Sequence, residues 1–351
     1  MKSREMTNPE PPHPFFHPVD EREVIPSFAR SDQAYPIEDF EKNKKKILDV
    51  VMVDCGNELY TFGIHPAKHK VDRMVRSMRK SLCASNQPPS TANLGRLGRL
   101  PVELLLDVLS HVDIATALRF RQVNRRAREV LGADKAYRTV MENALHVVFV
   151  MCSLRFTPYI RFDQLEALLL TDRCSYCGDF GRLLFMPTLA RCCELCLSRD
   201  SAAFEAVVLG EKQLQLFHQL GQPFTIMYSR PHHIQILGED SSKDRHWIAA
   251  AKMVPNSKEW DRMNMKKVHP NRTGYSLPFL HNNGTKLVSH NGRICNGCRT
   301  TARDYGIMAI IGRSSADQFH HMLSKRAYSS DGYFAHFKWC KPAQELWKHR
   351  R

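Results

Sequence analysis

The sequence lacks the features of a membrane or secreted protein. No stretch approaches the roughly 18 consecutive apolar residues that span a bilayer, and the longest candidate, Val147–Cys152, is far too short. The first 30 residues carry prolines and acidic side chains but no apolar core of a secretory signal. We therefore expect a cytoplasmic or nuclear protein without a membrane partner, whose 11 cysteines form no disulfide framework.

Motifs of the common catalytic classes are absent as well. The sequence contains no GxxxxGK[ST] or GxGxxG phosphate-binding loop, no GxSxG nucleophile motif and no HExxH zinc-hydrolase motif. No arrangement of nucleophile and base is legible along the chain. We therefore predict a non-enzymatic protein with no catalytic residues.

Positive charge is concentrated in the last third of the chain. The whole sequence has 51 Lys and Arg against 36 Asp and Glu, a formal net charge of +15. Residues 241–351 hold 20 basic and 7 acidic side chains and so carry +13 of that total. Such a region is compatible with binding to nucleic acid, anionic lipid or an acidic protein, and equally with a merely soluble surface.

The first 94 residues show little of the pattern of a folded domain. Pro9–Pro14 reads Pro-Glu-Pro-Pro-His-Pro, and residues 84–94 are rich in Pro, Ser and Asn. Residues 47–64 are apolar enough to suggest two short strands around Cys55–Asn57, although an isolated hairpin is barely stable. We predict that residues 1–94 are a largely disordered arm and linker.

Residues 95–142 have helical periodicity. Pro101 stands where a first helical turn would begin, since its missing N–H costs nothing there. Asp113 is expected to cap a second helix over residues 114–131, which Gly132 ends. A leucine-rich helical region of about 45 residues is too small to fold robustly alone. Its apolar stripe is therefore expected to contact a partner, the alternative being an internal core. The stripe consists of Leu104, Leu105, Val108, Leu109 and Val112.

The same residues resemble the F-box family. Residues 100–113 read Leu-Pro-Val-Glu-Leu-Leu-Leu-Asp-Val-Leu-Ser-His-Val-Asp, and residues 121–125 read Arg-Gln-Val-Asn-Arg, as in the family pattern. One departure is Ala127, where many members have Trp. The resemblance covers about residues 97–141 and implies docking to the Skp adaptor, and through it to the cullin, of a ubiquitin ligase. The positions that match the adaptor-binding segment are Leu100, Pro101, Leu104, Leu105, Val108 and Leu109.

Four cysteines in the middle of the chain have the spacing of a zinc site. Cys174 and Cys177 form one CxxC pair, and Cys193 and Cys196 form another pair 15 residues later. Two such knuckles surround one tetrahedral ion with four thiolates, which leaves no open position for a catalytic water. We predict a structural zinc ion here. Cys192 competes as third ligand, but Cys193 restores the two-residue gap.

The end of the chain carries a second, more widely spaced set of ligand residues. Cys295 and Cys298 form a third CxxC pair, and His336 and Cys340 stand four residues apart, on one face of a helix. Together they would make a site of three cysteines and one histidine, although 37 residues separate the two pairs. We predict a second structural zinc ion here; a site joining the first and third CxxC pairs is the alternative.

The order of the motifs resembles a group of fungal F-box proteins. In that group the F-box precedes Arg-Cys-x-x-Cys-Gly-Asp-Phe-Gly and Arg-Cys-Cys-x-x-Cys-Leu, and a CxxC pair, His-x3-Cys and Ala-x-x-Leu-Trp come late in the chain. The resemblance spans about residues 97–351 and implies an architecture rather than a particular substrate. The matching segments here are residues 173–181, 191–197, 295–298, 336–340 and 343–347.

These features predict an α-rich chain that is α+β overall. A disordered N-terminal arm would precede a small F-box helical domain at 95–142 and an irregular zinc-stapled α+β region at 143–351, with knuckles at 174–196 and 295–340. Between the knuckles we expect helices over residues 202–220 and 246–252 and strands at 224–228 and 233–237.

The favoured function is that of a substrate-recognition subunit of an SCF-type cullin-RING ubiquitin ligase. The F-box would bind the adaptor, and residues 143–351 would bind an unknown protein substrate. The alternative is a zinc-dependent nucleic-acid-binding protein that uses the basic residues 241–351. A RING-type ligase is excluded because the cysteine sets lack eight interleaved ligands with a C-x-H step.

Overall fold

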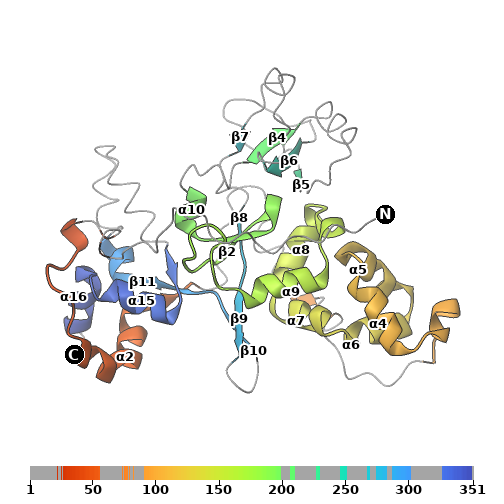
Figure 1. The fold of residues 1–351 in the computed structure, drawn as a ribbon, viewed down its shortest axis with the longest axis horizontal. Helices are drawn as coiled ribbons and strands as arrows, with labels where there is room; N and C mark the ends of the chain where they lie inside the picture. Colours follow the sequence, from red (N-terminus) through yellow and green to blue (C-terminus); the bar gives the residue numbers. More distant parts are fainter. Residues whose placement is uncertain are drawn as a thin grey trace.

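The protein is α-rich and α+β overall in the computed structural model (Figure 1). The structure describes residues 27–55, 91–198, 274–282, 287–301 and 326–349, together with short pieces outside these ranges. Those pieces are Arg22, Ile25, parts of 73–82, and the strands at 206–209, 227–229, 246–250 and 267–268. In this part of the chain, no helix combines the length and apolar character needed to cross a bilayer.

Short helices follow one another from residue 95 to residue 170. They begin with the 3-10 helix η2 (Gly95–Arg99) and include the 3-10 helix η3 (Thr157–Tyr159) before the last α-helix. The α-helices are α4 (Val102–Ser110), α5 (Ile114–Val123), α6 (Arg125–Ala133), α7 (Lys135–Asn143), α8 (Leu145–Ser153) and α9 (Phe162–Leu170).

Side-chain caps determine where three of these helices begin. Asp113, Asn124 and Asp134 each accept a hydrogen bond from the backbone N–H three residues later, at 2.8, 2.9 and 2.6 Å. The cap at Asp113 is as predicted, but the single helix over 114–131 is wrong. Asn124 takes an extended conformation and starts a new helix there, so Gly132 lies inside α6 and ends nothing.

One hydrophobic core joins these helices to the first cysteine region. It runs from Ile114 on α5 to Leu280 and includes all four cysteines of the first predicted zinc site. The core is continuous across residues 142 and 143, where we placed a boundary. The cysteine region contributes β2 (Leu183–Phe185), 3-10 helix η4 (Met186–Thr188), β3 (Ala190–Cys192) and α10 (Glu194–Ser198).

Strands from later in the chain complete this region. β8 (Gly274–Ser276) pairs antiparallel with β2, so the sheet has the order β3-β2-β8. β9 (Phe279–Asn282) and β10 (Leu287–His290) form a separate antiparallel hairpin. In Figure 1 this hairpin lies between the helices α4–α9 and the segment that holds the chain's C-terminal helices.

The N-terminal region folds against the end of the chain, which corrects the prediction of a disordered arm for residues 27–55. This region contains 3-10 helix η1 (Ser27–Ala29), α2 (Ile37–Val51) and β1 (Met52–Asp54). Its partners are β11 (Arg293–Cys295), β12 (Ala327–Tyr328), α15 (Ser330–Phe337) and α16 (Lys341–His349), in a sheet of order β1-β11-β12.

Long-range packing explains why the sequence pattern misled us here. Ile47 and Val51 are fully buried in a second core with Phe337 and Trp347. Residues 47–51 therefore end a helix instead of forming a strand, and residues 52–54 pair with β11 rather than with a neighbouring hairpin strand. The second predicted strand, after Cys55, lies outside the described residues.

A small sheet lies between the two cysteine regions along the chain. Its order is β5-β6-β4-β7, with bounds Met227–Ser229, His246–Ala250, Ala206–Leu209 and Lys267–Val268. The helices predicted over residues 202–220 and 246–252 are wrong at β4 and β6, because short apolar runs do not distinguish a strand from a helix. The strand predicted at 224–228 is present at residues 227 and 228, and that at 233–237 lies outside the described residues.

Candidate metal centres and interaction surfaces

The first cluster brings Cys174, Cys177, Cys193 and Cys196 together. Their sulfur atoms all lie within 4.8 Å of one another, and all four residues are buried. The sulfurs of Cys177 and Cys193 are 3.7 Å apart, which joins the two knuckles. Cys192 is not part of the cluster: it ends strand β3 opposite Leu183, and burial raises the pKa of its thiol well above 9.0.

The second cluster unites residues that are far apart in the sequence. Cys295, Cys298, His336 and Cys340 also have ligand atoms within 4.8 Å of one another and are buried. The sulfur of Cys340 lies 3.8 Å from that of Cys295 and 3.7 Å from that of Cys298. The Nε2 atom of His336 lies 3.4 Å from the Cys298 sulfur, so this nitrogen faces the cluster centre.

These distances fit zinc. With zinc–sulfur bonds of about 2.3 Å and zinc–nitrogen bonds of about 2.0 Å, a tetrahedral ion separates two sulfurs by about 3.8 Å and sulfur from nitrogen by roughly 3.5 Å. The observed sulfur–sulfur separations of 3.7 and 3.8 Å and the sulfur–nitrogen separation of 3.4 Å match these edges. Four protein ligands would close each coordination shell, so both sites suit a structural ion.

Backbone geometry orients the cysteine side chains of the first cluster. Gly178 has φ +76° and donates its N–H to the Cys174 carbonyl at 2.9 Å, which closes the tight turn after the first pair. In the second pair, the N–H of Cys196 points at the Cys193 sulfur at 3.4 Å. An N–H directed at sulfur favours the thiolate form, which is the form that binds metal.

Arg191 connects the first cluster to helix α9 through hydrogen bonds. This role was not predicted from the sequence. Its buried guanidinium donates to the carbonyls of Leu168 on α9, at 2.7 and 3.0 Å, and of Pro278, at 2.7 Å. Burial lowers its pKa to about 10, so the side chain remains a cation at neutral pH. The signal that could have indicated this role was the position of Arg191, directly before Cys192 and Cys193. A residue next to a buried ligand is expected to be buried too.

Two tyrosines support the second cluster, and these too were missed. The Tyr328 hydroxyl lies 3.1 Å from Nδ1 of His336, which leaves Nε2 for the metal. The Tyr333 hydroxyl donates to the Cys295 sulfur at 3.6 Å; burial and then the neighbouring thiolates raise its pKa well above 10.0, so it stays protonated. Tyr333 is three residues before His336, and that helical spacing could have identified it.

The N-terminal segment is part of the second cluster's support. Tyr333 also donates to the Val51 carbonyl at 3.4 Å, and the Trp347 indole donates to the Tyr35 hydroxyl at 3.0 Å. Gly297, inside the CxxC turn, lies so close to α16 that a Cβ atom would come within 2.5 Å of the Ala343 nitrogen. The candidate ligands of the second cluster, α16 and residues 27–55 therefore form one packed unit.

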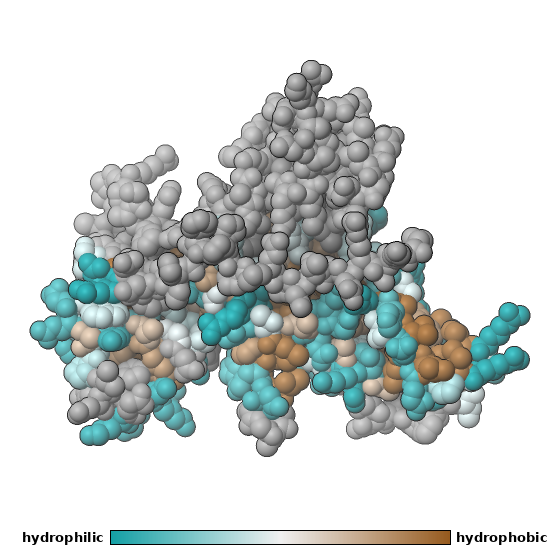
Figure 2. All heavy atoms as spheres, in the orientation of Figure 1, coloured by the Kyte–Doolittle hydropathy of each residue, from teal (hydrophilic) through white to brown (hydrophobic). Residues whose placement is uncertain are grey.

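The six positions predicted to bind the adaptor differ in how exposed they are. Leu104 is 51% exposed, Val108 50% and Leu100 38%, and Pro101 is also exposed. Leu109 is half-buried and packs against the core of α5–α9. Leu105 is buried at 5%, so its side chain faces inward rather than toward solvent. With Leu97 and Val102, the exposed members form an apolar surface at the α4 end of the molecule, seen as brown atoms in Figure 2.

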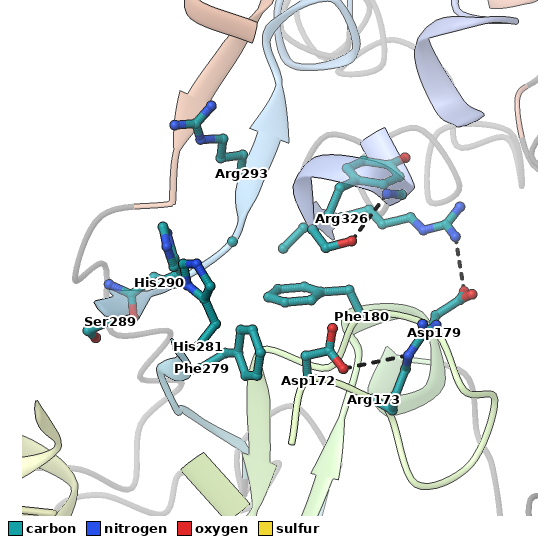
Figure 3. A pocket seen from close by; sticks show the side chains of 16 residues that line it. Asp172, Arg173, Asp179, Phe180, Phe279, His281, Ser289, His290, Arg293 and Arg326 are labelled. Atoms are coloured by element: carbon teal, nitrogen blue, oxygen red, sulfur yellow. Dashed lines mark hydrogen bonds and ion pairs between the residues drawn. The ribbon is translucent and has the colours of Figure 1, made fainter. Parts of the chain in front are cut away.

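A cavity of about 690 Å³ lies between the two clusters, and we call it the junction cavity (Figure 3). Its walls come from the loop of the first cluster, hairpin β9–β10, and the strands β11 and β12. None of the ligand or adaptor residues predicted from the sequence lines it. Its lining includes Asp172, Asp179, Phe180, Phe279, His281 and His290.

Comparison with known proteins identifies the helical region. Residues 97–138 match the model of the F-box domain family. The matched segment includes the exposed face of α4 and the helix caps at Asp113, Asn124 and Asp134. The chain therefore contains an F-box domain at residues 97–138, as the sequence pattern indicated. No curated protein and no solved structure matches the chain.

Proposed function

We propose that this chain is a substrate-recognition subunit of an SCF-type ubiquitin ligase. The observation that carries the proposal is the apolar face of Leu100, Leu104 and Val108, exposed within the matched F-box region. Exposed apolar side chains gathered on one face are typical of a protein-binding surface. The Skp adaptor would cover this face and connect the chain to a cullin, in the cytoplasm or the nucleus.

In this role the chain carries no chemical step. The zinc-supported region would hold a target protein, and the ligase's catalytic module would act on a substrate kept at high effective concentration. The two metal clusters would be structural, because each has four protein ligands and no open position for a substrate or water.

Replacement of Leu104 by Asp tests adaptor docking. The full chain is co-expressed with the Skp adaptor, because residues 27–55 belong to the fold. Leu170→Asp is the matched control, since Leu170 is 46% exposed on α9, outside the matched region, and Leu104 is 51% exposed. We expect a stable 1:1 complex for the parent chain and the control, and at least a roughly 100-fold weaker complex for Leu104→Asp.

Equal loss in both leucine variants, or no complex for the parent chain, would reject the adaptor role. The basic residues 241–351 would then favour the second candidate, a zinc-dependent nucleic-acid-binding protein. Salt-sensitive retention of the parent chain on random-sequence DNA or RNA, abolished by neutralising Lys and Arg in that region, would establish this candidate.

A further inference from the structure

A loop of the first cluster reaches the strands of the second. Asp179 stands two residues after Cys177, and its backbone carbonyl accepts the Cys174 N–H at 2.6 Å. Its carboxylate pairs with the Arg326 guanidinium at 3.0 Å, the contact drawn as a dashed line in Figure 3. Arg326 directly precedes β12 and is 147 positions away from Asp179 in the sequence. This ion pair therefore connects the two cluster regions directly.

An apolar contact holds this loop against the strands. Phe180, the residue after Asp179, packs against a small buried group at the sheet β1-β11-β12. The group consists of Cys55, Ile294 and Ala327. Gly292, just before β11, has φ +77°, and a Cβ atom there would overlap the Phe180 ring. The loop thus lies in a fixed position, from which the Asp179 carboxylate faces Arg326.

From Arg326 the contacts continue to a candidate ligand of the second cluster. The guanidinium carbon of Arg326 lies 5.0 Å from the centre of the Tyr328 ring, over which a cation is attracted. The Tyr328 hydroxyl lies 3.1 Å from Nδ1 of His336, and Nε2 of His336 faces the cluster. A group that contacts the outer nitrogen of a histidine ligand orients its ring. All three side chains are buried, so water does not screen these contacts.

We propose that Asp179 and Arg326 couple the two metal clusters, so that zinc in either cluster raises the affinity of the other for zinc. The first cluster, when filled, fixes the loop and with it the Asp179 carboxylate. Arg326, held by that carboxylate, positions Tyr328 and through it His336. When one cluster has already ordered these side chains, the other binds its ion without the entropic cost of ordering them. The benefit is reciprocal by thermodynamic necessity.

The coupling is expected to change the metal affinity of each cluster by about tenfold. This effect is much smaller than the whole binding energy of a closed zinc site. Each cluster therefore still fills when the other is removed by mutation, and only its affinity changes. The proposal rests on both clusters binding zinc and is independent of adaptor docking.

The test measures how strongly the first cluster holds metal with and without the second. The full chain is loaded with cobalt(II), whose absorption distinguishes four sulfur ligands from three sulfurs and one nitrogen, and is titrated with a chelator. Cys295→Ser removes the second cluster, and we expect the first to bind cobalt about tenfold more weakly. In the pair variant Asp179→Asn/Arg326→Gln, which replaces both charged groups by neutral amides, Cys295→Ser should lower this affinity by about twofold or less.

The matched control is Arg161→Gln/Asp163→Asn, which removes an ion pair of 2.7 Å outside this chain of contacts and should keep the tenfold effect of Cys295→Ser. Thermal melting establishes that the variants are folded. Asp179→Asn alone, a change of the same shape at the more exposed partner, replaces the pair variant if that variant does not fold.

Three outcomes would overturn the proposal. An unchanged first-cluster affinity in Cys295→Ser would show that the clusters are not coupled. An equal fall in the parent and the pair variant would show that the coupling does not pass through Asp179 and Arg326. Loss of the effect in the control as well would reduce the role of the pair to general stability. Adaptor binding enters none of these measurements, so failure of the ligase role would leave the coupling intact.

Discussion

The two candidate metal clusters differ in how far apart their ligands are in the sequence. The first lies within residues 174–196 and joins the core of helices α5–α9. The ligands of the second cluster are spread over residues 295–340. This cluster packs against residues 27–55, which stand almost 300 positions before helix α16 in the sequence. The first cluster strengthens a core that neighbouring helices also build, whereas the second lies in a core built by segments from opposite ends of the chain.

Cys177→Ser is expected to have the largest effect. The first cluster shares one core with α5–α9, so loss of its ion should destabilise the F-box helices as well as the knuckle. Zinc in structural sites contributes about 10–16 kcal/mol of binding energy, which is also folding energy. Circular dichroism should show loss of cooperative melting, and native mass spectrometry at most one zinc. Cys152→Ser, in neither cluster, is the control; an unchanged melt of Cys177→Ser would contradict the shared core.

Cys295→Ser should have a large but confined effect. The second cluster is then lost together with the docking of residues 27–55, while the core of α5–α9 and its own zinc remain. Limited proteolysis should cut within residues 27–55 first, and adaptor binding should match the parent. If adaptor binding failed too, the two clusters would not be independent.

Ile47→Asp tests the N-terminal contribution with a single side chain. Ile47 is fully buried in the second core, and a carboxylate there would be desolvated among apolar groups. We expect a loss of about 3–5 kcal/mol in the stability of this unit, measured by denaturant unfolding followed through tryptophan fluorescence. Lys45→Asp, exposed on the same helix, should change stability by less than about 0.5 kcal/mol. Similar values for both variants would contradict the packing of α2.

Tyr328→Phe should have the smallest effect of the series. It removes the hydroxyl that contacts Nδ1 of His336 and leaves the ring in place. Loss of such a contact weakens metal binding by about 10–100-fold. Competition with a chelator should release zinc from the second cluster at lower chelator concentration, with the first cluster in the same molecule as internal reference. Simultaneous release from both clusters would show that Tyr328 acts on general stability.

Local motifs made much of the site predictable. The two ligand sets could be chosen from spacing alone, because CxxC turns and a His-x3-Cys step place side chains on one face without help from the rest of the chain. The helix start at Asp113 was predictable for the same reason, since a cap and its acceptor N–H are three residues apart. The break at Asn124 uses an equally local signal, which we overlooked behind a continuous apolar pattern.

Contacts between distant residues were not predictable. Residues 47–54 are mostly apolar, and their sequence alone does not distinguish a helix from a strand. Packing against α15, α16 and β11 makes residues 47–51 the end of a helix and residues 52–54 an edge strand. The junction cavity depends on Asp172, His281 and Arg326, which are more than 40 residues apart from one another and carry no motif.

By itself, the sequence determined the F-box region, the composition of both ligand sets and the α-rich α+β class, because each follows from interactions over a few residues. The tertiary structure alone decided that Leu105 faces inward while Leu104 faces solvent, that residues 27–55 support the second cluster, and that a cavity forms between the clusters. These outcomes depend on which surfaces exclude water from one another, and burial is a property of the assembled fold rather than of any local segment.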